Sequence, residues 1–110
     1  MRIEINAVRL ELTDILKSYV EKKIGSVSKM VKKFEAQGEI VAFVEISRTS
    51  RHHKQGEIYY AEITMKLPHK TIRIERTDED MYGAIEELKD ELKEELGSIK
   101  GFSREARRRE

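Results

Sequence analysis

The sequence predicts an α+β domain, a two-layer sandwich in which a four-stranded mixed sheet carries two helices on one face. Short segments of alternating or continuous apolar residues predict strands at 1–7, 39–47, 58–67 and 71–75. Apolar residues at intervals of three and four predict helices over 14–34 and 77–96. The order of elements is therefore β-α-β-β-β-α. Each helix has one apolar stripe, so both helices can cover the same face of the sheet.

The first strand and helix follow from a change of period. In "MRIEINA", Ile3 and Ile5 face one way, and after Thr13, a suitable N-cap, the period becomes helical. We expect one continuous helix of about 20 residues, weakened by up to about 1 kcal/mol at Gly25 and terminated before Gly38. Its apolar face consists of Leu16, Val20, Ile24, Val27, Val31 and Phe34.

The remaining elements follow from apolar content and turn residues. Segment 39–47 is apolar on both sides near its middle, which predicts an interior strand. Pro68 marks a tight connection between antiparallel strands, and Thr77 with Asp80 resembles a capping box for the last helix. The first two strands are joined through a helix, so they should be parallel. The stripe of the last helix is Met81, Ile85, Leu88, Leu92, Leu96 and Ile99.

Length and composition indicate one domain, residues 1–100, followed by a basic, flexible tail at 101–110. There is no cysteine, which excludes disulfides and thiolate metal sites. No apolar run approaches the roughly 20 residues of a membrane span. We therefore expect a cytoplasmic protein without a membrane partner.

Charge is strongly segregated although the net charge is only +1. Residues 14–34 contain six lysines against two acids, and residues 78–96 contain nine acids against two lysines. Residues 97–110 contain five bases against two acids. The charge of each segment, rather than the net charge of the whole chain, therefore indicates the kind of partner.

Catalysis has little support in the sequence. Adjacent residues of an extended chain point to opposite sides, so His52 and His53 are poorly placed to bind one metal ion. There is no Gly-rich phosphate loop and no nucleophile motif. We expect no enzymatic activity, metal, cofactor or small-molecule substrate; a metal-dependent enzyme that uses these histidines or the outer acids of the last helix is the least favoured alternative.

Two basic groups favour an anionic partner. On a helical wheel, Lys22, Lys29 and Lys33 fall within about 40° of one another, opposite the apolar stripe, with Lys23 at the edge of that stripe. The second group lies in the expected hairpin tip "RTSRHHK" and includes Arg48, Arg51 and Lys54. RNA is favoured over DNA because no helix has the pattern of a recognition helix. The alternative is a solubilising helix face and a solvated turn.

Two motifs resemble those of a known family. Asp80-Met81-Tyr82-Gly83-Ala84-Ile85 opens the last helix, and the run from Leu12-Thr13-Asp14 to Tyr19-Val20-Glu21-Lys22-Lys23 spans the first. Together they resemble the ribosome hibernation promoting factor family, which includes ribosome-associated inhibitor A. The resemblance covers residues 1 to about 100 and extends to the order of elements.

The resemblance implies a translation inhibitor that occupies the mRNA and tRNA channel of the small ribosomal subunit and keeps ribosomes inactive. It implies rRNA contacts by Lys22, Lys23 and Lys100, whereas Lys29, Lys33, Arg48, Arg51 and Lys54 are candidates from charge clustering alone. The chain resembles the short form of the family. The alternative is a free-standing structured-RNA-binding module of the same fold.

One departure from the family concerns the last helix. Where the family commonly has Lys or Arg, this chain has Glu91, Glu94, Gly97 and Ser98. Either the arginines of the tail replace those contacts, or this face meets ribosomal protein.

Overall fold

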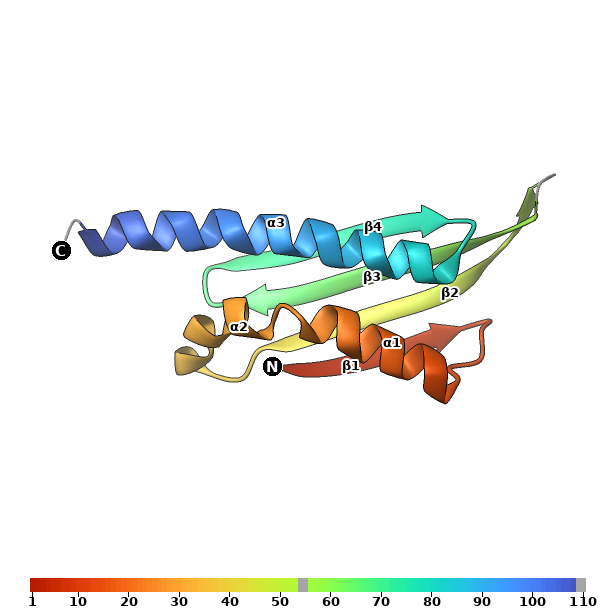
Figure 1. Cartoon of the computed structure of the whole chain (residues 1–110), viewed down its shortest axis with the longest axis horizontal. Coiled ribbons are helices and arrows are strands. Elements are labelled where there is room, and N and C mark those ends of the chain that lie inside the picture. The colour runs from red at the N-terminus through yellow and green to blue at the C-terminus, as the bar shows by residue number, and fades with distance from the viewer. Residues whose placement is uncertain (54–55, 109–110) are drawn as a thin grey trace.

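The computed structural model describes the backbone of residues 1–53 and 56–108 and the side chains of residues 1–49 and 56–99. Figure 1 shows a sheet layer and a helix layer along one long axis. The elements are β1 (Arg2–Val8), α1 (Asp14–Gly25), α2 (Ser28–Val31), the 3-10 helix η1 (Lys32–Gln37), β2 (Val41–His53), β3 (Gly56–Leu67), β4 (Lys70–Asp78) and α3 (Met81–Arg108).

The sheet has the predicted mixed topology. The strand order is β1-β2-β3-β4, with β1 parallel to β2 and the other neighbours antiparallel. The parallel pair is joined through α1, as a β-α-β crossover requires. The interior position predicted for segment 39–47 is confirmed, because β2 pairs with β1 and with β3.

The two faces of the sheet differ because side chains alternate along every strand. Register aligns Ile5, Val44, Ile63 and Ile74 across the four strands, and this apolar row belongs to the core beneath the helices. The adjacent row across the sheet consists of Asn6, Glu45, Glu62 and Glu75, whose side chains point to the opposite face. The helices cover only the apolar face (Figure 1), which confirms the predicted two-layer sandwich.

The prediction of one continuous first helix is wrong. The α-helix ends at Gly25, and Val27 has φ −93° and ψ 0° before α2 begins. Gly25 lowers helix stability, and the Ser26 hydroxyl donates to the Lys23 carbonyl oxygen at 2.6 Å, so both residues favour an end here. The predicted apolar face is nevertheless buried from Leu16 to Val31, with Phe34 half-buried against it.

The helix N-termini are capped by one predicted and one unpredicted residue. The Leu16 amide donates to Thr13 Oγ1 at 3.1 Å, which confirms Thr13 as an N-cap. The predicted capping box at Thr77 is wrong, because β4 continues through Asp78. Asp80 caps α3 instead, with Oδ1 accepting from the Tyr82 amide at 3.2 Å.

Two elements run further than expected. Residues 48–53, expected in a hairpin turn, continue β2, and the pairing with β3 shifts register between Arg48 and His52. Helix α3 continues to Arg108 and so enters the segment 101–110; flexibility of that tail stays a prediction.

Burial of the α1 stripe predicts a large difference between two isoleucines of one helix. Ile24 is fully buried, whereas Ile15 is 74% exposed. Ile24→Ala should lower the free energy of unfolding by about 2–5 kcal/mol through lost burial and a residual cavity, and Ile15→Ala by less than about 0.5 kcal/mol. Urea unfolding of both variants checks this, and equal losses would contradict the assigned helix face.

Candidate nucleic-acid interface

The three lysines expected to form one ridge lie in different helices. Lys22 is exposed in the last turn of α1 and Lys29 is exposed in α2, on either side of the break at 26–27. Lys33 is half-buried in η1, and its Nζ lies 5.1 Å from the centre of the Phe34 ring, a cation–π distance. Lys22 and Lys29 are therefore the members of this group that present their charge to solvent.

Lys23 is held by contacts within the protein. Its Nζ lies 2.9 Å from Glu86 Oε2 on α3 and 5.5 Å from the centre of the Tyr19 ring, and its side chain is 28% exposed. The predicted position at the edge of the buried stripe is confirmed, but the amine already has an anionic partner.

Among the hairpin candidates, Arg48 alone has a described side chain. It is exposed, with Nε 3.4 Å from Glu57 Oε2, and its carbonyl oxygen accepts from Arg9 Nε at 3.0 Å. The described part of the structure does not include Lys54, nor the side chains of Arg51, His52 and His53. The same holds for the side chain of Lys100 in α3.

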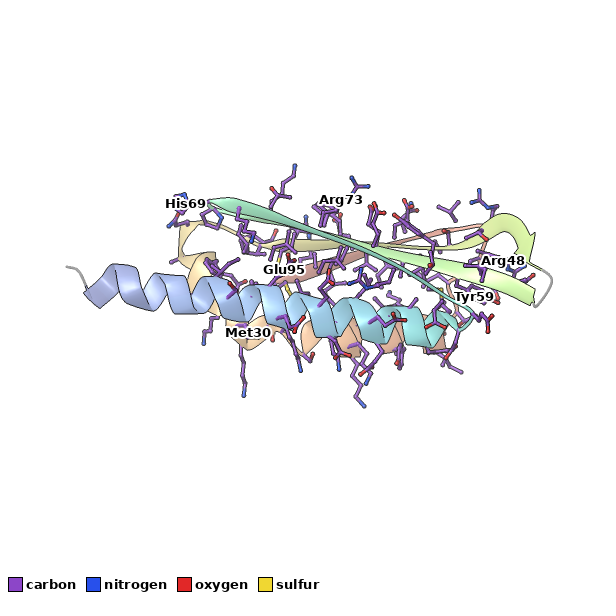
Figure 2. The ribbon with its side chains drawn as sticks, turned by 90° about the horizontal axis from the view of Figure 1, so that it is seen from above. Met30, Arg48, Tyr59, His69, Arg73 and Glu95 are labelled. Carbon is purple, nitrogen blue, oxygen red and sulfur yellow. The ribbon has the colours of Figure 1, made fainter. Side chains whose placement is uncertain are left out.

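The two basic groups are far apart. Figure 2 shows Met30, which follows Lys29, well removed from Arg48 along the long axis of the molecule. The molecule extends over 57 × 25 × 18 Å. Lys29 and Arg48 are therefore too far apart to bind one phosphate group together, and they would meet separate stretches of a ligand.

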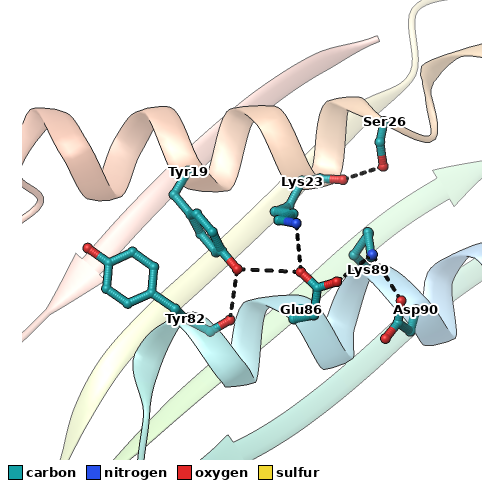
Figure 3. A network of polar contacts seen from close by, with 7 residues as sticks. All are labelled: Tyr19, Lys23, Ser26, Tyr82, Glu86, Lys89 and Asp90. Atoms are coloured by element: carbon teal, nitrogen blue, oxygen red, sulfur yellow. Dashed lines mark hydrogen bonds and ion pairs between the residues drawn. The ribbon is translucent and has the colours of Figure 1, made fainter.

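The two motifs that carried the family resemblance meet between α1 and α3. The rings of Tyr19 and Tyr82 pack edge to face, with centres 4.7 Å apart and planes at 82°. The Tyr19 hydroxyl lies 3.4 Å from both the Tyr82 carbonyl oxygen and Glu86 Oε2, so its one proton is shared between two acceptors. Figure 3 shows this polar network between the helices.

Glu86 is the centre of the network. Its Oε1 accepts from Lys89 Nζ at 2.6 Å and its Oε2 accepts from Lys23 at 2.9 Å (Figure 3). These two hydrogen bonds lower the pKa of Glu86 to about 2, and the bond from Lys89 has the larger effect. Asp90 also contacts Lys89, at 3.0 Å.

The acidic charge of α3 is partly neutralised inside the molecule. Besides the Glu86 network, Glu91 forms an ion pair with Arg76 of β4. Glu91 is one of the positions at which this chain departs from the expected basic pattern, and its carboxylate therefore stabilises contact between helix and sheet. Sequence reasoning missed Lys89 as a partner, although its spacing of three residues from Glu86 is a standard helical pairing signal.

The uncovered sheet face carries a second, separate network. Glu62 accepts from Tyr60 at 2.7 Å and from Arg73 at 2.7 Å, and Arg73 also lies 3.0 Å from Glu75. The bond from Arg73 is the main reason that the pKa of Glu62 is lowered, and burial raises the pKa of Tyr60. The charges of Glu62, Arg73 and Glu75 therefore partly neutralise one another.

Metal ligation and membrane-spanning helices were considered for the part of the chain that the structure describes. No three His, Cys, Asp or Glu side chains there are grouped to hold a metal ion. No helix there is long and apolar enough to cross a membrane.

The fold and the positions of Lys22 and Lys29 define an α+β domain whose helix layer exposes lysines. The chain belongs to the family described as Sigma 54 modulation protein / S30EA ribosomal protein, whose model matches residues 3–103. The family resemblance expected from the two helix motifs is thereby confirmed.

Curated relatives match over most of this chain. The Ribosome hibernation promotion factor of Lactococcus lactis subsp. cremoris (strain MG1363) is 29% identical over 100 residues, covering 91% of this chain and 50% of the relative. The protein of the same name from Staphylococcus aureus (strain COL) is 28% identical over 100 residues, covering 91% and 48%. The chain thus spans about half the length of these relatives.

Solved structures agree with the fold. The N-terminal domain of Thermus thermophilus Protein Y superposes with a TM-score of 0.70 at 30% identity, covering 90% of this chain and 99% of that one. A ribosomal subunit interface protein from Coxiella burnetii gives a TM-score of 0.73 at 20% identity, covering 92% and 99%, and supports the fold alone.

The Glu86 network predicts a pH-dependent stability difference. Because the pKa of Glu86 is lowered in the folded protein, its carboxylate stabilises the fold at pH values above the ordinary pKa of 4.5. This contribution is lost as the pH falls toward about 2. The Tm of wild type should therefore exceed that of Glu86→Gln at pH 6, and the difference should shrink by pH 2. Glu94→Gln, an exposed position of the same helix, controls for the loss of one negative charge. A wild-type advantage that is the same at both pH values would contradict the network.

Proposed function

We propose that this protein is a ribosome-binding translation inhibitor, a hibernation factor without enzymatic activity that acts in the cytoplasm. The observation that carries the proposal is the family match over residues 3–103, together with curated relatives named Ribosome hibernation promotion factor. The ribosome-binding part of those relatives would correspond to the region that this chain shares with them.

The finer proposal is that the protein binds rRNA of the small subunit, in the channel used by mRNA and tRNA. The exposed lysines Lys22 and Lys29 support it, because Lys amines suit backbone phosphates and require no base sequence. Lys23 joins them once its internal partner is displaced. Lys33, with its amine over an aromatic ring, contributes less.

The hairpin is proposed as a second, separate contact. Arg48 lies far along the long axis from Met30, the neighbour of Lys29 (Figure 2), so the hairpin and the lysine group would engage different rRNA segments. We assign Arg51 and Lys54 to this contact. We assign Lys100 and the arginines of the tail to a further rRNA contact near the C-terminal end of the chain.

Binding to the channel predicts competition with its ordinary ligands. The protein should co-sediment with small subunits at low salt, and subunits preloaded with mRNA and initiator tRNA should bind at least about tenfold less of it. Sucrose-gradient sedimentation measures both. Binding that is insensitive to preloading would exclude the channel, and equal affinity for naked structured RNA would favour the free-standing RNA-binding module.

Lysine contacts to phosphate predict a change of salt dependence. Lys22→Ala with Lys29→Ala should reduce the slope of log affinity against log salt by about two units, because each lost phosphate contact removes roughly one. The matched control is Lys66→Ala with Lys70→Ala, two exposed lysines of the sheet layer. Filter binding over a salt series, with folding verified for both variants, makes the measurement; identical slopes would contradict a lysine interface on the helix layer.

A further inference from the structure

Three donors from two helices converge on one carboxylate. Lys23 and Tyr19 come from α1, Lys89 comes from α3, and Glu86 receives all three (Figure 3). Lys89 uses one carboxylate oxygen and Lys23 the other, whereas the Tyr19 hydroxyl approaches the second oxygen more distantly.

The lysines of this group are held in place, unlike ordinary surface lysines. The Lys89 side chain is only 15% exposed and that of Lys23 28%, so their stems are largely packed and their amines are fixed between the helices. Fixed donors lose less conformational entropy on binding an anion than mobile ones. Glu86, with 38% of its side chain exposed, is the member that can rotate into solvent.

We propose that Tyr19, Lys23 and Lys89 form a binding site for one backbone phosphate of RNA, and that Glu86 occupies this site in the free protein. A phosphodiester group presents two terminal oxygens, as a carboxylate does, and can accept from the same two amines. The proposal rests on the ribosomal RNA contact proposed above and adds to it a specific site and an internal competitor.

The exchange has a definite electrostatic consequence. Glu86 must leave before the phosphate binds, and while it stays nearby it repels the incoming anion. The internal carboxylate therefore lowers affinity for RNA, and the remaining lysines Lys22 and Lys29 determine the first contact. A weakly held phosphate does not displace Glu86, which disfavours non-specific RNA.

Removing the competitor should strengthen binding. Glu86→Gln should raise the affinity for small ribosomal subunits on the order of fivefold and steepen the salt slope by about one unit. Glu94→Gln removes the same charge from an exposed position of α3 and should change affinity by less than about twofold. In a Lys23→Ala background the gain from Glu86→Gln should largely disappear, because the site has lost one amine.

A second measurement does not depend on ribosomes. Inorganic pyrophosphate added to Glu86→Gln should shift the backbone amide NMR signals of Tyr82 and Lys89, and the same concentration should shift them much less in wild type and in Glu94→Gln. If pyrophosphate binds there while no variant binds ribosomes, the proposed function fails and the site stands.

Several outcomes would overturn the site itself. Ribosome binding with equal gains for Glu86→Gln and Glu94→Gln, or a gain that persists after Lys23→Ala, would show only a general charge effect. Should Glu86→Gln fail to fold, Lys89→Ala in the wild-type background replaces it: we expect affinity about threefold weaker than wild type, and unchanged affinity in a folded variant would contradict the proposal.

Discussion

The apolar row of Ile5, Val44, Ile63 and Ile74 gives the sheet one face that must be covered. The connection between the parallel strands β1 and β2 brings α1 onto this face, and α3 returns over β3 and β4 to complete the layer (Figure 1). Both helices therefore lie side by side, with their apolar stripes turned inward and their charged residues turned outward or toward each other. The opposite sheet face stays open and carries paired charges such as Glu62 with Arg73.

The contact between the two helices depends on this arrangement. Tyr19 meets Tyr82, and Lys23 meets Glu86, only because α1 and α3 share one face of the sheet. The same contact limits the charge that α1 can offer to a partner, since the Lys23 amine is already paired. Exposed Lys22 and Lys29 keep their charge available. The helix layer thus combines two exposed lysines with a third, Lys23, whose amine is paired with Glu86 inside the protein.

The sequence predicted the fold because local patterns and tertiary burial agree. Alternation placed Ile63 and Ile74 inward, and the interval of three and four placed Val20 and Leu88 inward. The break after Gly25 was missed because the apolar stripe continues through it. Only the capping bond of Ser26 and the geometry of Val27 distinguish two short helices from one long helix.

The site was predicted less well, for a physical reason. Periodicity shows which way a side chain points from its own element, but it does not show which side chain on another element it meets. Lys23 was assigned correctly to the edge of the stripe, whereas its partner Glu86 lies 63 residues away and could not be found by spacing alone. The large separation of Arg48 from Lys29 likewise depends on the length of the hairpin, which continues as strand where turn residues were expected.

A cryo-EM reconstruction of the protein bound to the small ribosomal subunit tests the central claim most directly, which is that the helix layer contacts rRNA. We expect phosphate oxygens within hydrogen-bond distance of the amines of Lys22 and Lys29, with the open face that bears Glu62 and Arg73 turned away from rRNA. A complex in which rRNA covers that open face, while the α1 and α2 lysines point into solvent, would contradict it.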